Sequence, residues 1–272
     1  LDTVNLDGTA SRDPNATSVL AYKWSWVEKP ENASRAIILD EADNNIEDTW
    51  TTSATPHFFA IQAGTYKIRL TLQDIDKNCT EARSDEVIIS VVPDETIHLQ
   101  LNWSKPGNDH DLHLISPGGH HSRQCGQVKN GTDCCWSNCS TNMGTNHDCP
   151  PRGCPGPKEA PDWGAIGYRN DDPTLDIDDR EGKGPENVNL SLPVTGDYQV
   201  TVENYNGLDS VAITVKVYLF GSLAQTFRYG PPFTDNRLPA GYHWNVCKLR
   251  VIDDSHIEII PDGTMAISPE NQ

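Results

Sequence analysis

The chain has no apolar run approaching the roughly 18 residues that a membrane-spanning helix needs, so we expect no membrane span. It is also poor in positive charge: 21 lysines and arginines stand against 39 aspartates and glutamates, for a formal net charge of −18. Proteins that bind phosphate backbones or anionic membranes need a basic face. The charge balance therefore argues against DNA, RNA or anionic membranes as partners.

Signatures of common catalytic sites are missing as well. The 272 residues contain no GxSxG, no HExxH and no glycine-rich phosphate loop between a strand and a helix. A glycosidase needs only two carboxylates across a cleft. Because this chain is rich in aspartate, the number of its carboxylates does not exclude a glycosidase. We expect a protein that is not an enzyme, with a catalytic hydrolase as the less favoured alternative.

Residues that favour helices are scarce, whereas turn formers are abundant. There are two methionines, 20 glycines and 19 prolines, and threonine, valine, isoleucine and asparagine are frequent. This composition favours strands joined by turns. In residues 65–73, Tyr66, Ile68 and Leu70 alternate with polar residues, which is typical of a half-buried strand. Similar alternation recurs at 21–27, 86–92, 97–103, 196–203 and 211–219. We predict an all-β fold made of β-sandwiches.

A short break at Pro93-Asp94 separates two regions. We predict one β-sandwich over 1–93, a larger jelly-roll-like sandwich with a disulfide-rich loop over 94–252, and a C-terminal strand or tail over 253–272.

The first region carries motifs of a known domain: LDGTASRDPN at 6–15, WSW at 24–26, AGTYKIRLTLQD at 63–74 and a closing EVIISVV. Over residues 4–93 it resembles a PKD domain, although the insertion at 28–45 is long and the usual first strand before Val4 is missing. The resemblance implies an immunoglobulin-like β-sandwich of a kind common in cell-surface and secreted proteins. We expect Trp24 and Tyr66 to be core residues.

The second region has its own ordered motifs: LNW at 101–103, DHDLHL at 109–114, PDWG at 161–164, LDIDD at 175–179 and GPEN at 184–187. In residues 97–251 it resembles a β-sandwich domain of YfaP-like and myxobacterial surface proteins. That resemblance implies a surface location and leaves the molecular function open.

Two acidic elements, NDHDLHL at 108–114 and the segment 170–187, predict a cation site. Carboxylates at positions i and i+2, as in Asp109/Asp111 and Asp176/Asp178, project to one side of an extended chain. Crowded carboxylates in a loop with glycines suit Ca²⁺, a hard cation that takes six to eight oxygen ligands. An EF-hand is excluded because Arg180 occupies a ligand position. The expected ligands are Asp109, Asp111, Asp176, Asp178 and Asp179, with Glu186 or Asn187 in addition. The alternative is a solvated loop in which the aspartates cap turns.

Eight cysteines, six of them between residues 125 and 154, indicate disulfides formed in an oxidising compartment, and hence a secreted, extracellular or cell-surface protein. Their pairing is open. The chain shows no signal peptide, so we expect a processed product. Zinc held by His110, His113, His120 or His121 with cysteines is the less favoured reading, since no CxxC…CxxC spacing occurs. The disulfide candidates are Cys79, Cys125, Cys134, Cys135, Cys139, Cys149, Cys154 and Cys247, and the glycosylation candidates are Asn15, Asn32, Asn78, Asn102, Asn130, Asn138 and Asn189.

Together these features predict a structural or adhesive surface protein stabilised by calcium and disulfides, whose partners are other surface proteins or copies of itself. Strand-like residues at 257–269 suggest that a tail completes the sheet of a neighbouring copy and builds a filament. The alternative is a carbohydrate-binding or accessory module of a secreted hydrolase, in which Trp136 or Trp163 stacks on sugar.

Overall fold

The structure is a computed structural model that describes residues 2–12, 20–31, 33, 35–74, 83–121, 131–139, 161–208, 210–234 and 236–268. The chain divides into two compact units, Leu1–Val92 and Pro93–Gln272. Both are built from antiparallel strands, which confirms the all-β fold class. In the described part of the chain, no helix is long and apolar enough to cross a membrane.

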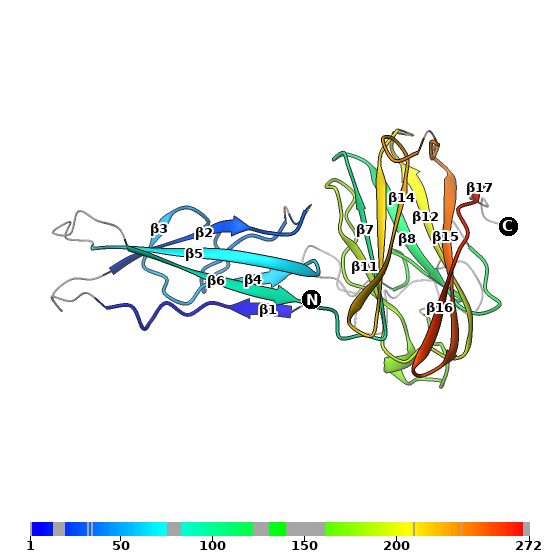
Figure 1. Cartoon of the computed structure of the whole chain (residues 1–272), viewed down its shortest axis with the longest axis horizontal. Helices are drawn as coiled ribbons and strands as arrows, with labels where there is room; N and C mark the ends of the chain where they lie inside the picture. Colours follow the sequence, from blue (N-terminus) through cyan, green and yellow to red (C-terminus); the bar gives the residue numbers. More distant parts are fainter. Residues whose placement is uncertain are drawn as a thin grey trace. The chain divides into compact units, whose positions relative to one another are not determined.

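The first unit contains a four-stranded sheet in the order β3-β2-β5-β6 and a two-stranded sheet of β1 and β4 (Figure 1). The strands are β1 (Asp2–Asn5), β2 (Leu20–Glu28), β3 (Trp50–Thr51), β4 (His57–Ala60), β5 (Gly64–Asp74) and β6 (Arg83–Val91).

Two alternate residues of β5 belong to the core of this unit. Tyr66 and Ile68 are fully buried, and the ring of Tyr66 lies 5.3 Å from that of Phe58. The Tyr66 hydroxyl donates a hydrogen bond to the Gln62 carbonyl at 2.9 Å, so its polar end is satisfied inside the core. Trp24 is also buried. The prediction that Trp24 and Tyr66 are core residues is confirmed.

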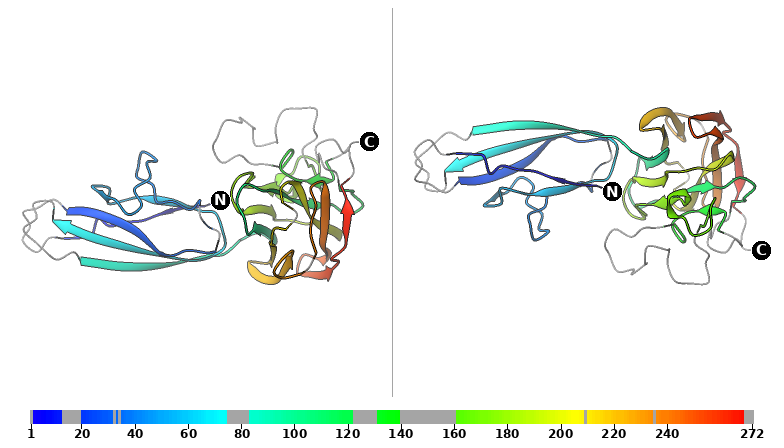
Figure 2. Two further views of the ribbon diagram at one scale, coloured as in Figure 1. Left: turned by 90° about the horizontal axis from the view of Figure 1, so that it is seen from above. Right: turned by 90° about the horizontal axis from the view of Figure 1, so that it is seen from below.

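The second unit consists of two antiparallel sheets. The five-stranded sheet has the order β10-β11-β7-β13-β14, and the six-stranded sheet has the order β16-β15-β12-β8-β9 with β17 also paired to β15. Figures 1 and 2 show the unit from three directions. The strands are β7 (Ile97–Trp103), β8 (Asp109–Ile115), β9 (Asp133–Cys134), β10 (Thr174–Leu175), β11 (Glu186–Leu190), β12 (Gly196–Asn206), β13 (Ile213–Leu219), β14 (Ser222–Tyr229), β15 (Tyr242–Asp253), β16 (His256–Pro261) and β17 (Met265–Ile267).

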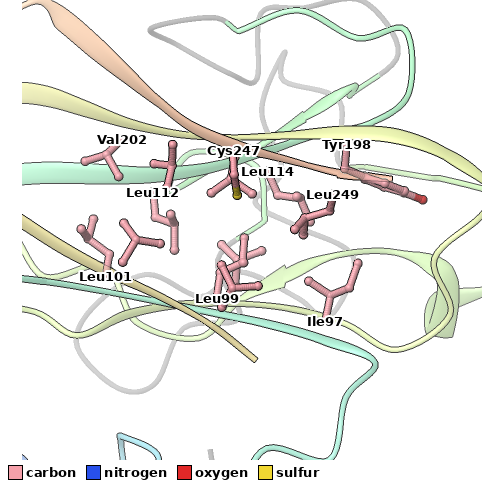
Figure 3. Close-up of a cluster of buried hydrophobic side chains, with 14 of the residues drawn as sticks. Ile97, Leu99, Leu101, Leu112, Leu114, Tyr198, Val202, Cys247 and Leu249 are labelled. Carbon is pink, nitrogen blue, oxygen red and sulfur yellow. The ribbon is translucent and has the colours of Figure 1, made fainter. Parts of the chain in front are cut away.

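The core of this unit lies between the two sheets. Leu99 and Leu101 of β7 face Leu112 and Leu114 of β8, together with side chains from β12 and β15 (Figure 3). All four of these leucines are fully buried. Packed apolar faces of this kind are the main stabilising contribution in a β-sandwich.

Both faces of β7 are buried, although the sequence alternates. His98, Gln100 and Asn102, the polar residues of this alternation, are 7%, 0% and 3% exposed. The His98 Nδ1 atom lies 2.6 Å from Asn189 Oδ1 on β11, so cross-strand polar contacts replace water on this side. The alternation therefore predicted which face of β7 is apolar, but it did not predict that the polar face is buried as well.

The last two described strands, β16 and β17, belong to the six-stranded sheet. Strand β16 pairs with β15 from Cys247↔Pro261 to Asp253↔His256, and β17 pairs with β15 from Tyr242↔Ile267 to Trp244↔Met265. Figure 2 shows these red strands beside β15. The boundary expected at residue 252 falls at the end of β15, which runs to Asp253 and is followed by β16. Strands β16 and β17 therefore pair within their own sheet, and the completion of another copy's sheet stays a prediction.

Candidate metal centre

The first half of β8 has an open edge that the acidic loop covers. Strand β9 pairs with β8 only at Leu114 and Ile115. In the middle of β8 the Leu112 backbone N–H donates to Glu186 Oε2 at 2.8 Å, and Glu186 is the first residue of β11 in the opposite sheet. The two sheets therefore meet through a carboxylate at this edge.

The loop before Glu186 is closed by its own backbone. Asp179 accepts hydrogen bonds from the N–H groups of Gly182 at 2.9 Å and Gly184 at 2.8 Å. Gly184 has a φ of +82°, and a Cβ atom there would lie 2.6 Å from the Leu101 carbonyl oxygen, so only glycine fits. Backbone contacts from Trp103 to the Lys183 carbonyl and from Gly107 to the Glu181 carbonyl hold the loop against the β7–β8 turn.

This arrangement brings three aspartates together. Ligating oxygens of Asp109, Asp111 and Asp178 all lie within 4.8 Å of one another. Asp111 is 2% exposed, and its Oδ2 atom has no hydrogen-bond partner among the residues that the structure describes. The Glu186 carboxylate beside them is completely buried. The predicted pairing of the two acidic elements in space is present.

The electrostatics of the cluster are those of crowded carboxylates. Burial, and then the neighbouring Asp178, raise the pKa of Asp109 to about 6. Burial and the charges of Asp109 and Asp178 raise the pKa of Asp111 well above its ordinary range, and burial with Asp111 and Asp178 does the same for Glu186. At neutral pH the group is destabilised by its own charge unless a cation or protons neutralise it.

The donor set fits a hard divalent cation. Three aspartates offer up to six carboxylate oxygens, which is within the range that Ca²⁺ requires. The buried Asp111 Oδ2 atom, which makes no hydrogen bond to the described residues, lies in the carboxylate cluster and fits a cation, since most buried polar atoms in proteins have partners. Asp109 and Asp111 would bind from β8 and Asp178 from the loop, with Glu186 adding negative charge.

Three other predicted ligands make different contacts. Asp176 accepts a hydrogen bond from Asn189 Nδ2 at 2.6 Å, and Asp179 closes the loop as described above. Asn187 Oδ1 accepts from Gln100 Nε2 at 3.5 Å. Asp176 and Asp178 thus have different neighbours, and both lie beyond the end of β10 at Leu175, whereas the i, i+2 argument assumes a strand.

A second group of ligand atoms comes from β8, from β12 and from the segment that follows β8. His113, His121 and Glu203 bring ligating atoms within 4.8 Å of one another. Burial lowers the pKa of His121, and the rings of His113 and His243 lower it further. Burial also lowers the pKa of His113, but the charge of Asp133 and its hydrogen bond, followed by Glu203, outweigh burial and raise that pKa to about 9.

His113 and His121 were predicted as zinc ligands only together with cysteines, and Glu203 was not among the predicted ligands. The sequence pattern that could have identified Glu203 is the alternation in 196–203, which places this residue on the side opposite the apolar face. The other two histidines considered for zinc lie elsewhere: His110 is completely buried with its ring 5.5 Å from that of Trp103, and His120 is exposed.

Among the described residues, both partners of one disulfide can be named. Cys134 and Cys139 are bonded to each other, and Cys135 is also disulfide-bonded. Cys247 was expected to belong to the disulfide framework, but its thiol is free and completely buried in the core of the second unit. The other candidates, Cys79, Cys125, Cys149 and Cys154, lie outside the described residues.

The described glycosylation candidates are buried. Asn102 and Asn138 are each 3% exposed and Asn189 is 6% exposed. Asn138 Nδ2 donates to the Asp133 carbonyl at 2.8 Å, and Asn189 Nδ2 donates to Asp176. A glycan on any of the three would displace packed side chains, so the folded structure argues against their modification. Asn15, Asn32, Asn78 and Asn130 lie outside the described residues.

Trp163 does not form a sugar-stacking surface. Its side chain is 6% exposed, packs against the ring of Tyr198 and donates from Nε1 to the Gly131 carbonyl at 2.8 Å. Trp136 is half-buried, with its ring 6.2 Å from that of Tyr205. The geometry of Trp163 therefore removes one of the two tryptophans on which the carbohydrate-binding alternative depended.

Comparison of the chain with models of known protein families, with curated proteins and with solved structures gives no match.

Proposed function

We propose that the second unit is a calcium-binding β-sandwich and that the chain serves a structural or adhesive role on a cell surface or outside the cell. The observation that carries this proposal is the cluster of Asp109, Asp111 and Asp178 with the buried Glu186 beside it. Four carboxylates in one partly closed site are costly without a cation. The neutralising charge of Ca²⁺ turns that cost into a stabilising contact.

The position of the cluster supports a structural role. Asp109 and Asp111 belong to β8 of the six-stranded sheet, and Glu186 begins β11 of the five-stranded sheet. A cation at this edge would therefore tie the two sheets and the acidic loop together. Extracellular modules bind Ca²⁺ with Kd values of about 10⁻⁴–10⁻³ M, which suits the calcium outside cells. The Cys134–Cys139 disulfide is consistent with an oxidising compartment.

The test compares thermal unfolding with excess Ca²⁺ and with chelator, for the parent protein and for Asp178→Asn. The parent should gain about 2.7 kcal/mol at a calcium concentration of 100 Kd. Asp178→Asn should lose most of that gain. In chelator the same variant should be at least as stable as the parent, because removing one charge relieves repulsion from Asp109 and Asp111.

Asp254→Asn is the matched control, since Asp254 is an exposed residue in the β15–β16 turn of the same unit and the change in charge is the same. The control should keep the full calcium gain. A parent protein whose midpoint is equal in calcium and in chelator would overturn the calcium site. An equal gain in stability from calcium in the parent and in Asp178→Asn would mean that calcium binds at another site.

A further inference from the structure

Outside the acidic cluster, the outer face of the six-stranded sheet carries a second group of ligand-forming side chains. Glu203 of β12 is the register partner of Asp111 on β8 and of His243 on β15, and Thr201 is the partner of His113. These residues alternate with the apolar core residues Leu112 and Val202, so they point away from the core between the sheets. They are nevertheless buried: His113 and Glu203 are 0% exposed and His243 is 7% exposed.

His121, six residues after β8 ends, brings its ring into this group. Its Nε2 atom lies 3.5 Å from Glu203 Oε2, and its side chain is 7% exposed. The Nε2 atom of His113 lies 3.9 Å from the same carboxylate oxygen. Two imidazoles and one carboxylate therefore converge on one point.

These separations correspond to the edges of a metal coordination polyhedron. Zinc binds nitrogen and carboxylate oxygen at about 2.0–2.2 Å, so two ligands of a tetrahedral ion lie about 3.4 Å apart. The separations of 3.5 and 3.9 Å from Glu203 Oε2 to the two ring nitrogens require only a small closure around such an ion.

Asp133 supplies the outer contact that metal-binding histidines commonly have. His113 Nδ1 lies 3.0 Å from Asp133 Oδ1 and 3.1 Å from Oδ2, in a pair that is completely buried. A carboxylate on one ring nitrogen fixes the tautomer and directs the other nitrogen toward the metal. Strand β9 and the Cys134–Cys139 disulfide hold Asp133 in this position.

Asp133 contacts Nδ1 of His113, so Nε2 of the same ring remains available to bind a metal ion. His113 Nε2 is buried and makes no hydrogen bond within the described ranges, and the same is true of both ring nitrogens of His121. A buried imidazole nitrogen that makes no hydrogen bond has lost its contact with water, and the charge of Glu203 at 3.5–3.9 Å is its only compensation among the described residues. A metal ion at the convergence point would satisfy one nitrogen of each ring at once.

We propose that His113, His121 and Glu203 bind a divalent transition-metal ion that prefers imidazole, with Zn²⁺ as the representative cation. The nitrogen-rich donor set distinguishes this site from the all-oxygen aspartate cluster, since imidazole suits zinc and carboxylate oxygen alone suits calcium. The inference does not depend on the calcium proposal. The ring of His243 stacks on that of His121 with centroids 4.0 Å apart and supports it from the β15 side.

The test is calorimetric titration of metal-stripped, untagged protein with Zn²⁺ while Ca²⁺ is saturating, followed by visible absorption of the Co²⁺ form. The parent should bind one equivalent, and Co²⁺ should give the intense d–d bands of a low-coordinate nitrogen and oxygen site. His121→Ala should weaken binding at least tenfold. This variant alters a residue outside the strands, and its fold is checked by circular dichroism.

Two matched variants make the outcome decisive. His120→Ala changes the adjacent, exposed histidine and should bind zinc as the parent does. Asp178→Asn alters the aspartate cluster and should also keep zinc binding, which separates failure of this site from failure of the calcium site. Unchanged affinity in His121→Ala, or loss of zinc binding in Asp178→Asn instead, would overturn the proposal. Should His121→Ala unfold, Glu203→Gln gives the same test by removing the charged ligand.

Discussion

Glu186 Oε2 lies 2.8 Å from the backbone nitrogen of Leu112 and accepts its hydrogen bond, so the first residue of β11 completes the open edge of β8. The same carboxylate is completely buried beside Asp111 and Asp178. Glu186 therefore stabilises the structure as a hydrogen-bond acceptor and destabilises it as a charge. The two contributions can be separated by substitution.

Glu186→Gln keeps an oxygen for the Leu112 N–H group and removes the charge, whereas Glu186→Ala removes both. In chelator at pH 7 we expect Glu186→Gln to be at least as stable as the parent. Glu186→Ala should lose about 1–3 kcal/mol, because a buried backbone donor is left unsatisfied. Urea unfolding of the three proteins measures the difference. An equal loss of unfolding free energy in both variants would mean that the charge of Glu186 does not destabilise the metal-free protein.

The pH dependence of stability follows from the raised pKa of Asp109. This pKa is about 6 in the folded protein and 3.8 for an unperturbed aspartate, so the folded state binds more protons between these values. The stabilising contribution is present below pH 3.8 and is lost as the pH rises through about 6. In chelator, the parent should therefore lose more stability between pH 5 and pH 7 than Asp109→Asn does.

Calcium should reverse the effect of pH at this site, because it binds the deprotonated carboxylates and its affinity rises over the same interval. The measurement is the free energy of unfolding at pH 5 and pH 7, with chelator and with Ca²⁺. The comparison with Asp109→Asn is needed because buried histidines such as His98 and His110, whose pKa values burial lowers, contribute in the opposite direction. The same pH dependence in parent and variant would contradict the raised pKa of Asp109.

Local patterns predicted the parts of the fold that depend on neighbouring residues. Alternation placed Tyr66 and Ile68 of β5 in the core, and the spacing of Asp109 and Asp111 put both carboxylates in one cluster. Strand β14 was not predicted. Its sequence, SLAQTFRY, lies at a sheet edge with mostly exposed or half-buried side chains, so it has no apolar face for periodicity to reveal.

Contacts that depend on pairing between strands far apart in the chain could not be predicted from the sequence. The contact of Asp176 with Asn189 arises from the β10–β11 pairing, and that of Glu203 with His113 and His121 from the registers of β8 and β12. The burial of the polar face of β7 likewise depends on its position between β11 and β13. Register between strands is set by the whole sheet, and one residue of slip would reverse every side chain.

Cys247 provides a test of the core itself. Its thiol is free and completely buried, and it lies among apolar side chains of both sheets (Figure 3). Burial, and to a smaller extent the charge of Asp262, raise the pKa of this thiol to about 12. The thiolate is the reactive form, so both low exposure and a high pKa suppress its chemistry.

We expect Cys247 to resist alkylation by iodoacetamide at pH 8 in the native protein and to react completely in urea without reductant. Mass spectrometry of peptides from native and unfolded samples locates the label and compares the rates. Cys247→Ala is the control that identifies the reactive thiol and should lose the label gained on unfolding. Because slow native labelling requires opening of the sandwich, adding Ca²⁺ should slow it further in the parent and not in Asp178→Asn. Rapid native labelling of Cys247 would contradict its placement between the sheets.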